Sequence, residues 1–309
     1  MLTTEVRYFL AVIDAGSLSA ASQHLFVATS AISRQIQQLE DKTGMPLFER
    51  HARGMTLTEA GRIFERHIRQ SQQAMESTLS EMKGRTALQR TTINIACTDG
   101  LAWNLLPALC SVFRQQYPSV SFHLKVGNSS QVLENLNRGG CDLALQFCLH
   151  SERRVQVLGS WPAPIMAAMS AKHPLAERPF VLQDLSGYPI ALPDHTTTVR
   201  QLFDLSCQLH GVFIEPMFTC NNFSSLYHFL KLNPLAITFC SQFTMKTDVC
   251  GLPFIMRNLF VNTLAERTLQ LHQLPGRYQS ASVRLFISFL QEALQQHLER
   301  SSDETMRVD

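Results

Sequence analysis

The sequence predicts an α+β protein with more than one domain, and three observations support this prediction. The chain has 309 residues, about twice the length of a usual single domain. Before residue 90 the apolar residues recur at helical spacing, interrupted by one short extended hairpin. After residue 90, strand-like segments alternate with helix-like segments, which is typical of helices wound around a sheet.

Composition indicates a folded chain with no strong charge bias. Hydrophobic residues make up 45% and charged residues 17%, which excludes an extended disordered chain. The 27 Lys and Arg nearly balance the 25 Asp and Glu, so the net charge predicts no long-range attraction to polyanions. Any contact with nucleic acid must therefore come from the local placement of side chains.

Two further classes are excluded by pattern. No run reaches the roughly 18 apolar residues of a membrane span, and polar residues interrupt the N-terminal segment, so we expect a cytoplasmic protein with no membrane partner. The eight cysteines are scattered without a CxxC pair or a Cys/His cluster. We therefore predict no metal site, no disulfide framework and no cofactor.

Residues 17–40 contain two short helical patterns separated by a brief break. Ser17 stands at an N-cap position for a first helix that ends near residues 24–26, and a second helix begins around Thr29. In the second helix Ile32, Ile36 and Leu39 share one buried stripe. The opposite face carries Ser30, Ser33, Arg34, Gln37 and Asp41. Such a face either contacts water or, in a helix-turn-helix, meets the edges of bases.

The segment "PLFERHARGMTLT", residues 46–58, follows directly and favours the second interpretation. Its two strand-like halves flank a turn at Arg53 and Gly54, where glycine permits a positive φ, and His51 and Arg53 lie near the tip. A helix-turn-helix followed by a hairpin with a basic tip is a winged helix.

Residues 1 to about 64 resemble the DNA-binding domain of LysR-type transcriptional regulators. The resemblance is carried above all by the segment "FLAVIDAGSLSAASQHLFVATSAISRQIQQLEDKTGMPLFERHARGMTLTEAG". The resemblance implies a bacterial, sequence-specific regulator of transcription that binds double-stranded DNA and is not an enzyme. It places the DNA contacts at Thr29, Ser30, Ser33, Arg34, Gln37 and Arg53. Where the family usually has Ser-Gln followed by Pro or Ser, this chain has Ala28, Thr29 and Ser30, so we expect an altered base preference.

A long helix is predicted to follow a cap at Thr58. Its apolar stripe runs through Phe64, Ile68, Ser71, Met75, Leu79 and Met82, with a period near 3.5 that suits pairing with a second helix. The alternative is packing on its own domain. The resemblance favours a linker helix that joins protomers, and hence a homodimer or homotetramer. RNA polymerase would be a further partner if the protein is an activator, but both activation and repression remain open.

The resemblance also implies a two-lobed effector domain of the periplasmic-binding-protein type. The implied domains are a winged helix-turn-helix at 1–58, a linker helix and hinge at 59–90, an effector domain at 91–300 and a polar tail at 301–309. One lobe would hold residues 93–164 and 268–300, and the other residues 165–267. A small-molecule effector would lie between the lobes.

Three segments place polar side chains between a strand and a helix, where hydroxyls and helix amides can hold a ligand. They carry Thr98, then Asn128 and Ser129, then His195, Thr196 and Thr197. Each alone is more often an N-cap than a ligand site, but together they favour a ligand site. Because these segments contain no Arg or Lys before Arg200, and Asp99 adds an acid, we expect a small polar metabolite.

Two rival functions remain. A solute-binding protein or an enzyme could use the same α/β half, but the sequence has no GxSxG motif, phosphate-binding loop or metal-spaced cluster. A redox-sensing regulator could use Cys207, which would need a thiol of low pKa and a resolving partner, and no cysteine closely precedes it.

Overall fold

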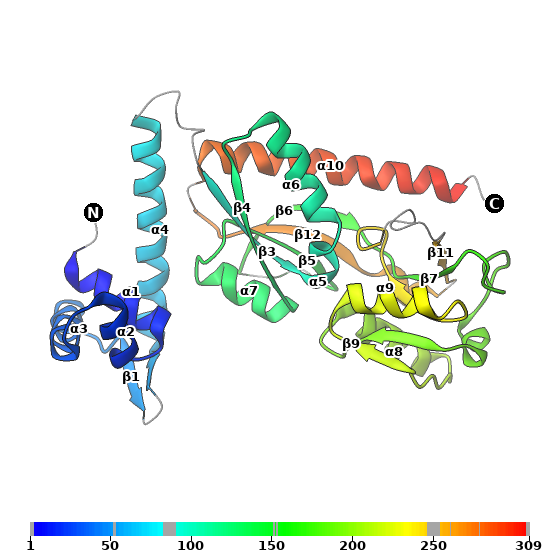
Figure 1. The fold of residues 1–309 in the computed structure, drawn as a ribbon, viewed down its shortest axis with the longest axis horizontal. Helices are drawn as coiled ribbons and strands as arrows, with labels where there is room; N and C mark the ends of the chain where they lie inside the picture. The colour runs from blue at the N-terminus through cyan, green and yellow to red at the C-terminus, as the bar shows by residue number, and fades with distance from the viewer. Residues whose placement is uncertain are drawn as a thin grey trace. The chain divides into compact units, whose positions relative to one another are not determined.

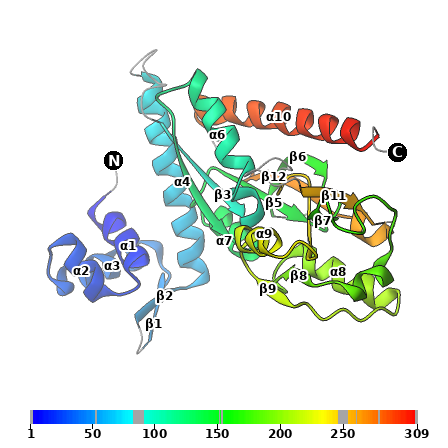
Figure 2. The same ribbon diagram turned by 45° about the vertical axis from the view of Figure 1, so that its right-hand side comes forward.

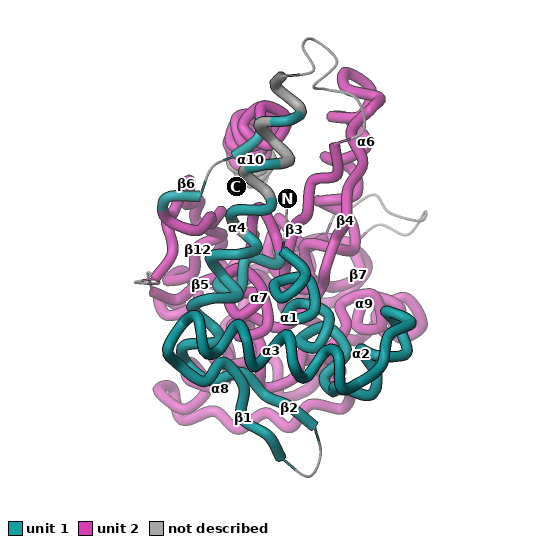
Figure 3. Tube along the Cα trace, turned by 90° about the vertical axis from the view of Figure 1, so that its left-hand side faces the viewer, with its two compact units in different colours: residues 1–87, 137–140, 276–280 teal, residues 88–136, 141–275, 281–309 magenta. Residues whose placement is uncertain are grey.

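The computed structural model describes residues 3–51, 54–82, 91–150, 152, 154–245, 254–259, 261–277 and 279–306. The chain divides into two compact units, which Figure 3 colours separately. The first unit comprises residues 1–87 with the short segments 137–140 and 276–280, and the second comprises the rest. Among the described residues, no helix is both long enough and apolar enough to cross a membrane.

The first unit is a winged helix with a long helix attached. It contains α1 (Thr4–Ala15), α2 (Leu18–Leu25), α3 (Thr29–Thr43), β1 (Phe48–His51), β2 (Gly54–Leu57) and α4 (Glu59–Met82). As predicted, Ser17 caps α2, its hydroxyl accepting from the Ala20 amide at 3.1 Å. The expected stripe of α3 is buried against α1 in a small core. The Glu40 carboxylate of α3 accepts from the Leu47 and Phe48 amides and so fixes where the hairpin begins.

The hairpin β1–β2 extends from the three-helix bundle, as Figure 2 shows. Its strands are antiparallel, with Phe48 opposite Leu57 and His51 opposite Gly54. Thr58 ends the hairpin and caps α4, because its hydroxyl accepts from the Gly61 amide at 2.9 Å. Gly54 has the positive φ expected of it, at 135°. A Cβ at Gly54 would lie 2.6 Å from the Gly16 carbonyl oxygen, so the wing approaches the bundle closely here.

Replacing Gly54 with alanine is expected to destabilise the winged helix by about 1 to 3 kcal/mol, because the φ of 135° is strained for any L side chain and the Cβ would collide with backbone. Urea unfolding followed by circular dichroism measures this. Gly44→Ala is the matched control, since Gly44 also has a positive φ but a Cβ there meets nothing within 4 Å. Equal losses in the two variants would show that the close approach to Gly16 does not contribute.

The second unit contains two five-stranded sheets. The first sheet has the order β4-β3-β5-β12-β6, formed by β3 (Thr92–Thr98), β4 (Ser121–Gly127), β5 (Leu143–Cys148), β6 (Gln156–Pro162) and β12 (Thr268–Gln273). Strands β4, β3 and β5 are parallel, whereas β12 is antiparallel to β5 and β6. Residues of α5 (Asp99–Ala102), α6 (Leu105–Gln116) and α10 (Ala281–Met306) share one core with this sheet. The helix α7 (Ser129–Asn137) contributes to a separate, smaller core.

The second sheet has the order β11-β7-β10-β8-β9. Its strands are β7 (Met166–Ser170), β8 (Ile190–Pro193), β9 (Phe218–Cys220), β10 (Ile237–Cys240) and β11 (Phe254–Asn258). The helices α8 (Thr198–Leu209) and α9 (Phe223–Leu232) and the 3-10 helices η2 (Leu182–Gly187) and η3 (Asn262–Ala265) accompany it. Strands β10, β8 and β9 are parallel to one another, and β7 is antiparallel to both of its neighbours, β10 and β11.

The chain therefore leaves the first sheet after β6, builds the second, and returns through β12 (Figure 1). We refer to each sheet with its helices as a lobe. This is the multi-domain α+β architecture that the sequence predicted, with a winged helix followed by a two-lobed α/β region. The crossings between lobes bring the carboxyl ends of β3, β4, β8 and β9 to one cavity, as described below.

Candidate functional site

The outer face of α3 is polar and open. Thr29, Ser30, Arg34 and Gln37 are exposed and Ser33 is half-buried, while the opposite stripe of Ile32, Ile36 and Leu39 is buried. The first acidic residue of α3 is Glu40, which the hairpin amides engage. The first two and a half turns of the helix thus present hydroxyls, amides and one guanidinium without a carboxylate among them. Such groups match the donors and acceptors of bases and phosphates.

The N-terminus of α3 lacks a side-chain cap. Ala28 occupies the N-cap position and makes no side-chain hydrogen bond to the helix. The first amides of a helix carry partial positive charge and hold anions when no cap engages them. Immediately before, Phe26 adopts a left-handed conformation (φ 55°) that ends α2 and leaves its ring 94% exposed. The turn therefore leaves the uncapped start of α3 exposed to solvent.

On the hairpin, Arg53 lies outside the described residues, so its predicted role at the tip stays a prediction. His51 is exposed on β1, and its Nε2 lies 3.1 Å from the Thr56 hydroxyl. Arg50 is also exposed on this strand. The sequence did not single it out, because strand alternation places Arg50 on the same face as the buried Phe48, whereas the residues after Phe48 are all exposed.

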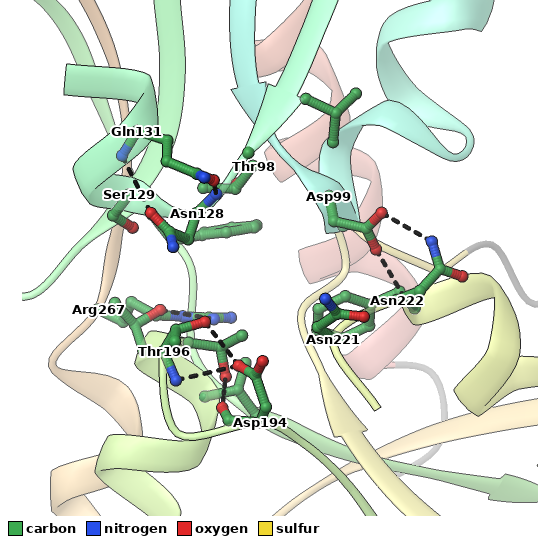
Figure 4. A pocket seen from close by; sticks show the side chains of 18 residues that line it. Thr98, Asp99, Asn128, Ser129, Gln131, Asp194, Thr196, Asn221, Asn222 and Arg267 are labelled. Carbon is green, nitrogen blue, oxygen red and sulfur yellow. Dashed lines mark hydrogen bonds between the residues drawn. The ribbon is translucent and has the colours of Figure 1, made fainter. Parts of the chain in front are cut away.

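The second unit contains a cavity of about 390 Å³ between its lobes (Figure 4). Its walls come from the ends of β3, β4, β5, β8 and β9, from the helix starts that follow four of these strands, and from Arg267 just before the return strand β12. The lining residues are Thr98, Asp99, Gly100, Val126, Gly127, Asn128, Ser129, Gln131, Phe147, Asp194, Thr196, Thr197, Thr198, Val199, Asn221, Asn222, Phe223 and Arg267. Ligands of open α/β sheets bind beyond the carboxyl ends of strands, where this cavity lies.

Five of the six residues predicted for this site line the cavity, namely Thr98, Asn128, Ser129, Thr196 and Thr197. Their hydrogen bonds differ. The Thr197 hydroxyl accepts from the Arg200 amide at 3.2 Å, so Thr197 is an N-cap of α8. Asn128 exchanges hydrogen bonds with Gln131 across the start of α7. The Thr98 hydroxyl, in contrast, is buried and has no hydrogen-bond partner.

His195 is the sixth residue predicted for this site, and its role stays a prediction. It is not among the residues that line the cavity, and its side chain is 75% exposed, with Nδ1 3.5 Å from a carboxylate oxygen of Asp204 on α8. The reason is the turn at the end of β8. Asp194 accepts from the Thr196 amide and hydroxyl, and this turn directs the aspartate and the threonines inward while His195 stays at the rim.

Several lining residues were missed from the sequence. Asn221 and Asn222 stand between β9 and α9, the same polar position between strand and helix that identified the other segments, so the pattern was available. Asp99 links the lobes, because its two carboxylate oxygens accept from the Asn222 side chain at 2.9 Å and from the Phe223 amide at 2.6 Å. Figure 4 shows these contacts at the side of the cavity.

Arg267 is the one cation among the described residues that line the cavity. It is 1% exposed, and its guanidinium lies over the Phe147 ring with its carbon 4.3 Å from the ring centroid. Nε donates to the Ala163 carbonyl at 3.0 Å, Nη1 contacts the Thr198 hydroxyl at 3.4 Å, and Nη2 has no partner. Burial lowers the pKa of Arg267 to about 9, because a buried charge loses its hydration. The side chain is still cationic at neutral pH.

Cys207, the candidate redox residue, lies on α8 within the core of the second lobe. Burial raises the pKa of its thiol to about 11, and the Asp204 carboxylate acts in the same direction. A reactive sensor thiol needs the opposite shift.

We therefore expect Cys207 in the folded protein to alkylate far more slowly than free cysteine. At pH 7 only about one part in ten thousand of a thiol with this pKa is thiolate. Iodoacetamide labelling followed by peptide mass spectrometry measures the rate, with urea-unfolded protein as the control. Labelling of folded and unfolded protein at equal rates would reopen the redox alternative.

A winged helix with an open polar helix, joined to a two-lobed domain with a cavity between its lobes, defines a ligand-responsive DNA-binding regulator. Comparison with known proteins specifies the family. Residues 3–62 match the model of the bacterial regulatory helix-turn-helix protein, lysR family, and residues 86–295 match the LysR substrate binding domain. The chain belongs to the LysR family of transcriptional regulators.

Individual relatives agree with this assignment. The transcriptional dual regulator GltC of Bacillus subtilis is 32% identical over 211 residues, which is 67% of this chain and 70% of GltC. A full-length OxyR variant from Pseudomonas aeruginosa shares the fold with a TM-score of 0.70 at 14% identity, over 94% of both chains. Full-length CbnR in complex with its target DNA aligns with a TM-score of 0.58 at 16% identity, over 97% of this chain and 100% of CbnR.

The protein is accordingly a DNA-binding transcriptional regulator with an effector-binding domain. Members of this family bind DNA and form oligomers. The family consists of transcriptional regulators rather than enzymes. Membership of this family therefore argues against the alternative that the α/β half is an enzyme.

Proposed function

We propose that α3 enters the major groove of an operator and reads it with Thr29, Ser30, Ser33, Arg34 and Gln37. The observation that carries this proposal is the open polar face of α3, which has no carboxylate in its first two and a half turns and adjoins an uncapped helix start. Arg34 can pair with guanine through two hydrogen bonds or hold a phosphate, and Thr29 offers a methyl group to thymine. Arg53 at the hairpin tip would lie in or beside the minor groove.

We propose that the domain limits are 1–58 for the winged helix, 59–90 for the linker helix and hinge, and 91–300 for the effector domain. The functional unit would be a homodimer or homotetramer that joins through α4 and engages two half-sites. Two linked winged helices bind two half-sites with an avidity that one small winged helix lacks. RNA polymerase would be contacted if the protein activates transcription.

We also propose that the cavity between the lobes is the effector site, with Thr98, Asn128, Ser129, Thr196 and Thr197 among its contacts. Both lobes contribute to its wall, and Asp99 of the first lobe is hydrogen-bonded to the start of α9 in the second. A ligand that binds one arrangement of the lobes more tightly than another shifts the population toward it. That difference in affinity is what control of the DNA-bound oligomer requires.

Selection of genomic fragments tests the DNA proposal. The purified protein is incubated with fragmented DNA from its source, and the bound fragments are sequenced, with an Arg34→Ala, Arg53→Ala double variant as the control. We expect enrichment of a few intergenic sites that share an imperfect dyad, lost in the variant. Featureless recovery, equal in both proteins, would contradict the proposal.

Salt dependence offers a second test of the same surface. Phosphate contacts release counterions, so affinity should fall as salt rises. The modest local basicity of the winged helix predicts a moderate slope. A binding constant that is unchanged between low and physiological salt would exclude phosphate contacts as a source of affinity.

A further inference from the structure

Arg267 is held in the wall of the cavity by contacts that leave its charge uncompensated. Nε and the aromatic face of Phe147 fix the guanidinium, whereas Nη1 makes only the long 3.4 Å contact to the Thr198 hydroxyl and Nη2 makes none. Among the described residues, no carboxylate forms an ion pair with Arg267. Neighbouring neutral groups satisfy part of its hydrogen-bonding capacity and none of its charge.

An isolated buried cation is unfavourable, because burial removes hydration that only a counter-ion can replace. Proteins therefore rarely retain an unpaired buried arginine outside a functional site. Arg267 is almost completely buried and lines the cavity between the lobes (Figure 4). A ligand that brings a negative charge into this cavity would give Arg267 the counter-charge that no described carboxylate supplies.

The two carboxylates of the cavity do not serve Arg267. Both oxygens of Asp99 accept from the start of α9, and one oxygen of Asp194 accepts from the amide and hydroxyl of Thr196. They do limit what can bind. The wall carries one cation, Arg267, and two carboxylates, Asp99 and Asp194. A ligand with several negative charges would form an ion pair with Arg267 through one of them, and the two carboxylates would repel the others.

Two other features describe the rest of the ligand. The Thr98 hydroxyl is a second buried polar atom of the wall without a partner, and it can donate to an oxygen. Phe147, Val126, Val199 and Phe223 supply apolar wall. A cavity of about 390 Å³ admits a small organic molecule and is much larger than an inorganic anion needs.

We propose that the effector is a small organic acid with a single carboxylate, which pairs with the guanidinium of Arg267 and receives a hydrogen bond from Thr98. The inference rests on the proposed role of the cavity as the effector site. The planar guanidinium matches a carboxylate through two parallel hydrogen bonds. Because the contact to Thr198 is long, the guanidinium can exchange it for the ligand with a small rotation.

The test compares carboxylates with neutral molecules of the same shape. Purified protein is titrated with propionate, 2-oxobutyrate and benzoate, and with their primary amides, and the Tm is recorded. Ribose, sodium sulfate and sodium phosphate at matched ionic strength form the other arms. We expect saturable stabilisation by at least one carboxylate and binding of its amide weaker by roughly tenfold or more.

Variants assign the effect to Arg267. Arg267→Met keeps most of the side-chain volume without the charge, and we expect it to weaken the responding carboxylate by roughly tenfold or more. Arg257→Met is the matched control. Arg257 lies on β11 outside the cavity and donates to the Ala176 carbonyl, so this variant should bind the carboxylate as the original protein does. The comparison of acid with amide needs no variant, so it decides the question even if Arg267→Met folds poorly.

Three outcomes would overturn the inference. They are tightest binding of sulfate or phosphate, binding of an amide or of ribose that Arg267→Met retains, and no response to any carboxylate of the series. The selection of genomic fragments is run on the same preparation. If it succeeds while the carboxylate arm fails, the regulator assignment stands and the class of effector is wrong.

Discussion

Replacing Arg34 with alanine is expected to weaken binding to a specific operator by about 1 to 3 kcal/mol, roughly 5- to 150-fold in Kd. Arg34 is exposed on the open face of α3, one turn from the uncapped helix start. It is the only cation of that face before Lys42. Its removal therefore eliminates the one group in the first turns of α3 able to make paired hydrogen bonds to guanine or a charged contact to phosphate. Fluorescence anisotropy with a fragment recovered from the genomic selection measures the change.

The control for this variant separates base reading from general charge. Arg62→Ala removes one positive charge from α4, where Arg62 pairs with Glu59 at 3.1 Å, and should leave affinity within about twofold. Affinity for a scrambled duplex should fall less than affinity for the operator if Arg34 contacts a base. Unchanged affinity of Arg34→Ala for the operator would remove Arg34 from the recognition surface.

The winged helix was predictable because its signals are local. Ser17 as a cap, the stripe of Ile32, Ile36 and Leu39, and the glycine that the hairpin needs are each encoded within a few residues of the structure they produce. The side chains of a short helix that must bury one stripe are assigned to inside or outside by periodicity alone. The polar face of α3 followed from the same stripe.

The cavity was only partly predictable, because its residues come together through topology. Polar residues between a strand and a helix gave Thr98, Asn128 and Thr196, since sheets collect such positions at one edge. Arg267 gave no comparable signal. It precedes the return strand β12 and reaches the cavity only because the chain builds the whole second lobe before rejoining the first sheet. The sequence predicted only a small polar metabolite, because the three segments between strand and helix contain no Arg or Lys before Arg200.

The stripe of α4 divides into two parts, which refines the choice between packing on its own domain and pairing with a second helix. Phe64 and Ile68 pack on the core of the winged helix. Met75 and Leu79, farther along the stripe, remain 48% and 47% exposed. Ser71, between Ile68 and Met75, is exposed, and the side chain of Met82 lies outside the described residues. The first part of the stripe therefore belongs to its own domain, and the second part is available to a partner helix.

The double variant Met75→Glu, Leu79→Glu is expected to convert the oligomer into monomers and to lower affinity for a dyad operator by roughly a hundredfold or more. Two carboxylates on a helix seam would have to lose hydration without a compensating partner, and a monomer loses the avidity of two linked heads. Sedimentation velocity and anisotropy on the same samples measure both effects. Affinity for a single half-site should change little, because these positions lie beyond the winged-helix core.

The matched control keeps the stripe apolar. Met75→Leu, Leu79→Met exchanges the two side chains and should retain both the oligomer and the affinity, since such swaps conserve volume and polarity. If the glutamate variant dissociates but binds the dyad as tightly as before, the two heads do not act together on DNA. If it remains oligomeric, the exposed end of α4 is not the seam, and the contacts that join protomers must lie on the effector domain.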